Sequence, residues 1–80
     1  MIILWQFDGC PFCKKVMEKL TELSIDFVSI TAPVTNESKR EFLKKIGGKD
    51  QTPFIIDTDE LVMMYESDEI IEFLEKNYGK

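Results

Sequence analysis

The sequence predicts an α/β domain in which three helices cover a four-stranded mixed sheet, with the elements in the order βαβαββα. Two observations lead to this expectation. Short apolar runs alternate with segments whose apolar residues recur at helical spacing, and two apolar runs near the C-terminus lie close enough together to form a hairpin. The chain has 80 residues, of which 44% are hydrophobic. This length and composition suit one compact core, so we expect a single domain over residues 1–80.

A change of period near residue 10 indicates the first strand and the first helix. Residues 2–7, IILWQF, form an apolar run that is typical of a strand covered on both faces. Pro11 fits the first position of a helix, because its missing N–H is not needed there and its φ is already helical. Cys10 is then expected at the N-cap and Cys13 in the first turn. The apolar, inward face of this helix is predicted to carry Phe12, Val16, Met17, Leu20 and Leu23.

A second strand and a second helix are expected next. Residues 26–30, DFVSI, are rich in β-branched and aromatic residues and predict a strand. Since a strand, a helix and a strand in succession usually form a right-handed crossover, the first two strands should be parallel. Thr35 or Asn36 caps the next helix, which ends at Gly47 and Gly48. The inward residues of this helix are predicted to be Phe42, Leu43 and Ile46.

A hairpin and a last helix complete the expected fold. The apolar runs at 53–57, PFIID, and 61–66, LVMMYE, are separated by the polar segment TDE, which predicts a short turn. Ser67 is expected to cap the last helix, whose first turn is acidic and which ends at Gly79. The inward face of this helix is predicted to carry Ile70, Ile71, Leu74 and Tyr78.

The composition argues against several classes of function. The net charge is −5 and acidic residues are spread along the chain, so nucleic acid is not an expected partner. The chain contains no histidine, the commonest metal ligand and general base, and we expect no metal. No run approaches the roughly 18 to 20 apolar residues of a membrane span, and the N-terminal run lacks the pattern of a signal peptide. We therefore expect a cytoplasmic protein with no membrane partner.

The two cysteines in DGCPFCKK, residues 8–15, are expected to be a reaction centre. A disulfide between Cys10 and Cys13 closes too short a loop to serve mainly as a staple. A structural zinc site needs four ligands, and the chain offers two cysteines and no histidine. Free amides at a helix N-terminus favour a thiolate, so Cys10 is the expected nucleophile and Cys13 the residue that resolves its disulfide. The alternatives are a metal or cluster shared by two chains, and two unreactive buried cysteines.

Three motifs resemble those of the glutaredoxins, small proteins of the thioredoxin fold, and the resemblance covers essentially the whole chain. The motifs are CPFC at 10–13, QTPF at 51–54 and YESDEI at 65–70. The resemblance implies a thioredoxin-like fold and a cis bond between Thr52 and Pro53, which turns the Thr52 backbone toward glutathione. From the residues alone, a simpler interpretation is favoured, in which Pro53 starts an edge strand.

The segment at 65–70 carries the second part of the implied glutathione site. The resemblance implies that Glu66, Ser67 and Asp68 hold the γ-glutamyl end, with its carboxylate at backbone N–H groups and its ammonium at the Asp68 carboxylate. From the residues alone, a Ser67 helix cap is favoured. The stretch 61–79 is also similar to the glutathione-binding domain of glutathione transferases, where Glu-Ser occupies this turn.

The resemblance implies a glutathione-dependent thiol-disulfide oxidoreductase that acts through the CPFC dithiol. The implied partners are glutathione, as co-substrate, and disulfide-bearing or glutathionylated proteins, and we expect a monomer. Two alternatives are a redoxin reduced by thioredoxin reductase and a dimeric carrier of an iron–sulfur cluster. Two positions depart from the glutaredoxin pattern: Phe7 stands where many members carry a basic residue, and Glu66-Ser67 replaces Gly-Gly. The candidates for a basic rim around the acidic tripeptide are Lys14, Lys15 and Lys49.

Overall fold

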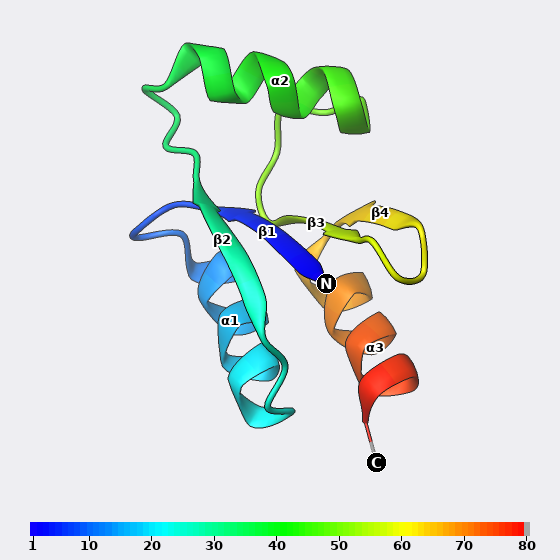
Figure 1. The fold of residues 1–80 in the computed structure, drawn as a ribbon. Coiled ribbons are helices and arrows are strands. Elements are labelled where there is room, and N and C mark those ends of the chain that lie inside the picture. The colour runs from blue at the N-terminus through cyan, green and yellow to red at the C-terminus, as the bar shows by residue number, and fades with distance from the viewer. Residues whose placement is uncertain (80) are drawn as a thin grey trace.

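The computed structural model describes residues 1–79, which form four strands and three helices in the predicted order (Figure 1). The elements are β1 (Ile2–Gln6), α1 (Pro11–Glu22), β2 (Phe27–Thr31), α2 (Glu37–Gly47), β3 (Phe54–Asp57), β4 (Val62–Tyr65) and α3 (Ser67–Tyr78). The strand order is β2-β1-β3-β4. β1 is parallel to β2, whereas β3 is antiparallel to both β1 and β4. The predicted mixed sheet, parallel crossover and hairpin are confirmed. None of the described helices has the length and apolar character needed to cross a membrane.

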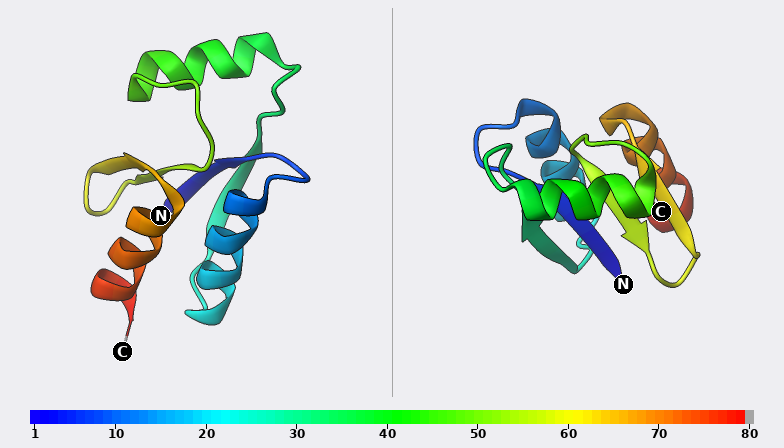
Figure 2. Two further views of the ribbon diagram at one scale, coloured as in Figure 1. Left: turned by 180° about the vertical axis from the view of Figure 1, so that it is seen from behind. Right: turned by 90° about the horizontal axis from the view of Figure 1, so that it is seen from above.

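The sheet separates two layers of helix (Figures 1 and 2). α1 and α3 lie against one face, and α2 crosses the other. Successive side chains of a strand point to opposite faces, so Leu4 packs toward α1 and α3 while Trp5 packs toward α2. The buried core on the α1 and α3 side is Ile2, Leu4, Val16, Leu20, Ile55, Ile70 and Leu74. The core on the α2 side is Trp5, Ala32, Leu43, Phe54 and Tyr65. Each fully buried large apolar side chain stabilises the fold by about 1.5–3 kcal/mol.

Local sequence determines the start of α1 and both ends of α2, as predicted. α1 begins at Pro11, and the N-cap Cys10 accepts a hydrogen bond at its Sγ from the N–H three residues on, at 3.2 Å. Asn36, one of the two predicted caps, begins α2, since its Oδ1 accepts the N–H of Lys39 at 3.1 Å. Gly48 ends α2 with a φ of 92°, a left-handed conformation that favours glycine.

Two aromatic residues that the sequence places inside are exposed instead. Phe12 is 58% exposed, because the first turn of α1 borders an open groove rather than the underside of the sheet. Phe42 is 53% exposed, although its ring lies 6.5 Å from that of Trp5. α2 turns Leu43 and Arg40, three residues apart, toward the interior, and Phe42 lies about 100° around the helix from Leu43. Phe42 shows that helical spacing does not reveal how wide the covered face is, and Phe12 shows that it does not reveal where along the helix the cover ends.

The start of α3 also differs from the prediction. The N-cap is Glu66, with a φ of 68° and no capping hydrogen bond to its side chain, and Ser67 is the first residue of the helix. β4 ends at Tyr65, so a single residue must reverse the chain between strand and helix. The prediction of a Ser67 cap is therefore wrong. The backbone N–H groups of Ser67 and Asp68 lie in the first turn, where the helix supplies no carbonyl acceptor.

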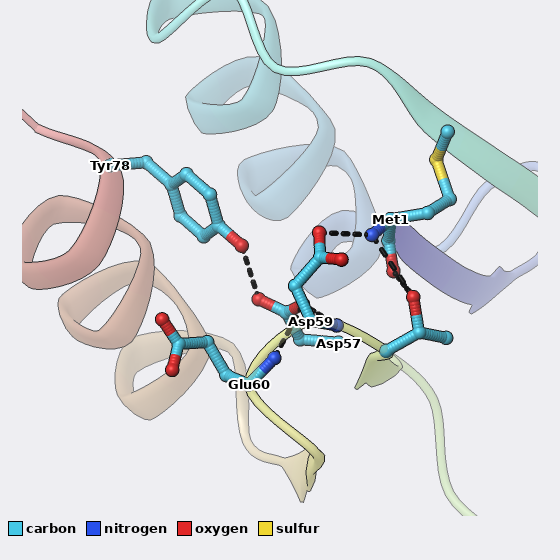
Figure 3. Close-up of polar contacts among 6 residues, drawn as sticks. Met1, Asp57, Asp59, Glu60 and Tyr78 are labelled. Atoms are coloured by element: carbon cyan, nitrogen blue, oxygen red, sulfur yellow. Dashed lines mark hydrogen bonds and ion pairs between the residues drawn. The ribbon is translucent and has the colours of Figure 1, made fainter.

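A buried carboxylate, Asp57, connects the hairpin turn to α3 (Figure 3). Asp57 is fully buried and accepts hydrogen bonds from the N–H groups of Asp59 at 2.9 Å and Glu60 at 3.3 Å, and from the hydroxyl of Tyr78. Burial by itself raises the pKa of Asp57, but the hydrogen bonds, of which that from Tyr78 is the largest, outweigh it and hold the pKa below its ordinary value. The same hydrogen bond, followed by burial, raises the pKa of Tyr78 to about 12.

We expect Tyr78→Phe to destabilise the fold by about 1.5–3 kcal/mol at pH 7, because it removes a hydrogen bond to a buried charge. The pKa of Asp57 is lower in the folded than in the unfolded chain. Its contribution is therefore present above the unfolded pKa and is lost as pH falls through the folded pKa. In urea unfolding, the difference between Tyr78→Phe and the wild type should accordingly shrink in acid.

The control for this prediction is Asp59→Asn in the same turn. The side chain of Asp59 is 76% exposed, so we expect a change below about 1 kcal/mol. Equal stability of the wild type and Tyr78→Phe at pH 7 would contradict the assigned role of this hydrogen bond.

Candidate functional site

The two cysteines lie where the loop after β1 meets the N-terminus of α1. They form a disulfide with Cα atoms 5.2 Å apart, a usual separation for this bond. Cys10 is 6% exposed and Cys13 is fully buried, so Cys10 is the more accessible of the two, as predicted. Gly9, with a φ of 89°, turns the chain into the helix. The N–H of Cys13 points at the Sγ of Cys10, an arrangement that also stabilises a thiolate at this position.

The segment before β3 carries the second motif. The bond between Thr52 and Pro53 is cis, as the resemblance implies. Pro53 is buried and precedes β3, which begins at Phe54. β3 lies between β1 and β4, so the alternative interpretation of Pro53 as the start of an edge strand is wrong.

A groove of about 370 Å³, called the Pro53 groove below, brings the three motifs together. It is lined by Phe12, residues 51–53 and residues 66–68. The predicted glutathione-site residues that line it are Thr52, Pro53, Glu66, Ser67 and Asp68. Cys10 and Cys13 do not line the groove themselves, but Phe12 lies between them in the chain. Residues from three separate segments therefore share one concave surface beside the disulfide.

Two polar pairs lie at this groove. Gln51 Nε2 donates to Glu66 Oε1 at 2.9 Å, and Lys15 Nζ donates to Asp68 Oδ1 at 2.8 Å. The side chains of Lys15 and Asp68 are 49% and 87% exposed, so water screens this ion pair and a ligand can exchange with it. Of the other two lysines predicted for a basic rim, Lys49 lies over the Tyr65 ring at 5.7 Å, and neither it nor Lys14 lines the Pro53 groove.

Arg40 on α2 is a charged residue near the site that the sequence analysis missed. It is only 7% exposed, and its guanidinium lies 5.4 Å from the centre of the Phe7 ring. Its Nη1 donates to Asp50 at 3.2 Å, whereas Nε and Nη2 have no partner among the described residues. The carbonyl of Phe7 in turn accepts the N–H of Cys10 at 3.3 Å. α2 thus brings a positive charge to the ring that stands where many glutaredoxins carry a basic residue. Arg40 lies three residues before Leu43, so it shares the inward face of the helix, and this spacing could have predicted its burial.

Comparison with known proteins gives a consistent picture. Residues 4–80 match the family model of the glutathione S-transferase N-terminal domain. Glutaredoxin 1 of Rickettsia felis is 36% identical over 55 residues, which cover 68% of this chain and 54% of that protein. An uncharacterized glutaredoxin-like 8.6 kDa protein in the rubredoxin operon of Clostridium pasteurianum is 28% identical over 76 residues, covering 95% and 100% of the two chains. The chain thus spans about half the length of the Rickettsia relative.

A solved structure extends the match to the whole fold. A glutathione transferase homologue from Drosophila mojavensis with bound glutathione has a TM-score of 0.88 and 24% identity, covering 99% of this chain and 36% of that one. The thioredoxin-like fold expected from the sequence is therefore confirmed. On the match over residues 4–80, this chain belongs to the family of glutathione S-transferase N-terminal domains.

Proposed function

We propose that the protein is a glutathione-dependent thiol-disulfide oxidoreductase that acts through Cys10 and Cys13. One observation supports this most: a cysteine pair at a helix N-terminus lies beside a groove lined by residues of all three glutaredoxin-like motifs. A helix N-terminus favours the thiolate that thiol-disulfide exchange requires. No histidine is needed as a general base, because the amides and dipole of α1 stabilise the thiolate form of Cys10.

The proposed cycle consists of two thiol-disulfide exchanges. The Cys10 thiolate attacks the glutathione sulfur of a mixed disulfide, the S–S bond breaks, and the substrate leaves as a thiolate that takes up a proton. A second glutathione thiolate then attacks the glutathione sulfur on Cys10, releasing glutathione disulfide and the Cys10 thiolate. With a protein disulfide, Cys10 first forms a mixed disulfide with one substrate sulfur. Cys13 then attacks the sulfur of Cys10, which frees the substrate thiol and leaves a Cys10–Cys13 disulfide. Two glutathione molecules reduce this disulfide.

The Pro53 groove offers a complementary group for each part of the γ-glutamyl-cysteine portion of glutathione. The backbone N–H and C=O of Thr52 pair with the cysteinyl residue, and the first-turn amides of Ser67 and Asp68 bind the carboxylate. The ligand ammonium binds the Asp68 carboxylate in place of Lys15. A homologue from Drosophila mojavensis that shares the fold contains bound glutathione, which supports glutathione as the ligand.

Turnover of the mixed disulfide between glutathione and 2-mercaptoethanol tests the proposal. Glutathione supplies electrons, and glutathione reductase couples the product to loss of NADPH. We expect turnover that increases in proportion to the amount of protein. If the protein turns over with thioredoxin reductase and NADPH but not with glutathione, then thioredoxin reductase and not glutathione is the electron donor. Absence of turnover with either donor would contradict the proposed activity.

We expect Lys15→Met to lower the KM for glutathione about two- to fourfold with little change in kcat, because Lys15 no longer competes with the ligand ammonium for Asp68. Asp68→Asn should raise the same KM. Lys19→Met is the matched control, since Lys19 lies one turn further along the same face of α1, pairs with Glu22 and Glu75, and lines no part of the Pro53 groove. A KM that is unchanged or higher in Lys15→Met would rule out this competition.

A further inference from the structure

A second pocket lies at the cysteines, apart from the Pro53 groove. It has a volume of about 540 Å³ and is lined by residues 6–11 together with Lys14, Met17 and Thr31. We call it the Met17 pocket. It shares no lining residue with the Pro53 groove. Cys10 lines the Met17 pocket and not the groove, so the more accessible cysteine opens onto it.

The Met17 pocket is largely apolar and is fixed by the core. Phe7, Pro11 and Met17 are its apolar residues, and Gln6, Asp8, Lys14 and Thr31 are the polar ones. Met17 also packs against the core between the sheet and the helices α1 and α3, which holds its side chain in place. Along α1 the pocket adjoins a shallow surface that Lys14 and Met17 also line, together with Glu18, Thr21 and Glu22.

We propose that the Met17 pocket binds the segment of a protein substrate that adjoins its reacting cysteine, and that it selects an apolar residue there. The inference rests on the proposed function, because it concerns the substrate of the same cysteine. A substrate held in a disulfide with Cys10 is anchored at one wall of the pocket. Its neighbouring residues then lie beside Phe7 and Met17, where an apolar side chain removes apolar surface from water. Glutathione, in contrast, occupies the Pro53 groove.

The test uses a reaction in which glutathione takes no part. Reduced Cys13→Ser protein is mixed with short peptides whose single cysteine forms a disulfide with thionitrobenzoate. The Cys10 thiolate attacks the peptide sulfur, the S–S bond breaks, and the electron pair leaves with thionitrobenzoate, the thiolate of lower pKa and therefore the better leaving group. Because Cys13 is absent, the peptide stays bonded to Cys10. The released yellow thiolate reports the rate of this one step.

The peptides carry leucine or serine beside the cysteine, on either side in turn, and are otherwise identical. Each rate is divided by the rate of the same peptide with dithiothreitol, which removes differences in intrinsic reactivity. We expect leucine to react about tenfold faster than serine at one of the two positions. In Met17→Gln, of similar length, the preference should fall to about twofold.

Two further variants control for effects on the fold. Met63→Gln changes a methionine on β4 that is 55% exposed and far from the pocket in the sheet order, and it should keep the tenfold preference. Thr31→Tyr adds an aromatic ring at the pocket wall, and tyrosine is well tolerated in a strand. By filling the space, it should abolish the preference.

The outcomes separate this inference from the proposed function. Equal corrected rates for leucine and serine peptides overturn the inference, even where turnover with glutathione is observed. A preference that persists in both Met17→Gln and Thr31→Tyr overturns it as well, because the pocket is then not its source. A leucine preference that both variants remove supports the inference. This holds even where no turnover with glutathione is found and glutathione is rejected as the reductant.

Discussion

Cys10→Ser is expected to reduce glutathione-dependent turnover to the rate measured without protein, whereas Cys13→Ser should still reduce glutathione mixed disulfides. A serine hydroxyl does not ionise near neutral pH and cannot replace the thiolate that forms the mixed disulfide. The structure explains why Cys13 cannot substitute for Cys10. Cys13 is fully buried in the first turn of α1, and its backbone N–H points at the Sγ of Cys10.

The same two variants should differ on a protein disulfide. Release of such a substrate through an intramolecular bridge needs both sulfurs, so Cys13→Ser should lose this reaction while keeping the other. The measurement is turnover of both kinds of substrate by the wild type and the two variants, with intact folding checked by circular dichroism. Turnover that survives in Cys10→Ser would disprove Cys10 as the nucleophile.

Gly47→Ala is expected to destabilise the fold by about 2–3 kcal/mol, although alanine is the better helix former. A Cβ at Gly47 would lie 2.7 Å from Cζ of Tyr65 and 2.8 Å from Cε1 of Phe54, and closer still to the Tyr65 hydroxyl. That hydroxyl accepts the N–H of Lys49 at 3.0 Å and donates to its carbonyl at 2.7 Å. The methyl group therefore displaces a buried ring and breaks its hydrogen bonds.

Thermal and urea unfolding measure this effect, and the melting temperature should fall by on the order of 10 °C. Gly48→Asn is the matched comparison, because a Cβ there meets open space and only the left-handed φ opposes the side chain, so we expect a smaller loss of about 1 kcal/mol. In the double variant Gly47→Ala with Tyr65→Phe, the nearest clashing atom is gone. The loss should therefore be at least about 1 kcal/mol smaller than the sum of the two single losses. A Gly47→Ala protein as stable as the wild type would show that Tyr65 moves aside without cost.

The signals that predicted the fold correctly were local. The apolar run before residue 8, the proline at the start of α1, the asparagine cap of α2 and the hairpin each depend on residues close together in the chain. The same holds for Cys10, because an N-cap position follows directly from the proline after it. The three glutaredoxin-like motifs could be recognised individually. That they line one groove is a property of the folded chain.

What the sequence by itself determined, then, was the type and order of the elements and the position of the cysteine pair at a helix N-terminus. These depend on backbone propensity and on the period of apolar residues, which act over a few residues. Only the tertiary structure decided the exceptions to the apolar faces that the sequence predicts. Phe12 and Phe42 are exposed, Arg40 is buried against Phe7, and Gly47 has no room for a methyl group. Burial depends on which distant element faces a side chain, and helical spacing and propensity contain only part of that information.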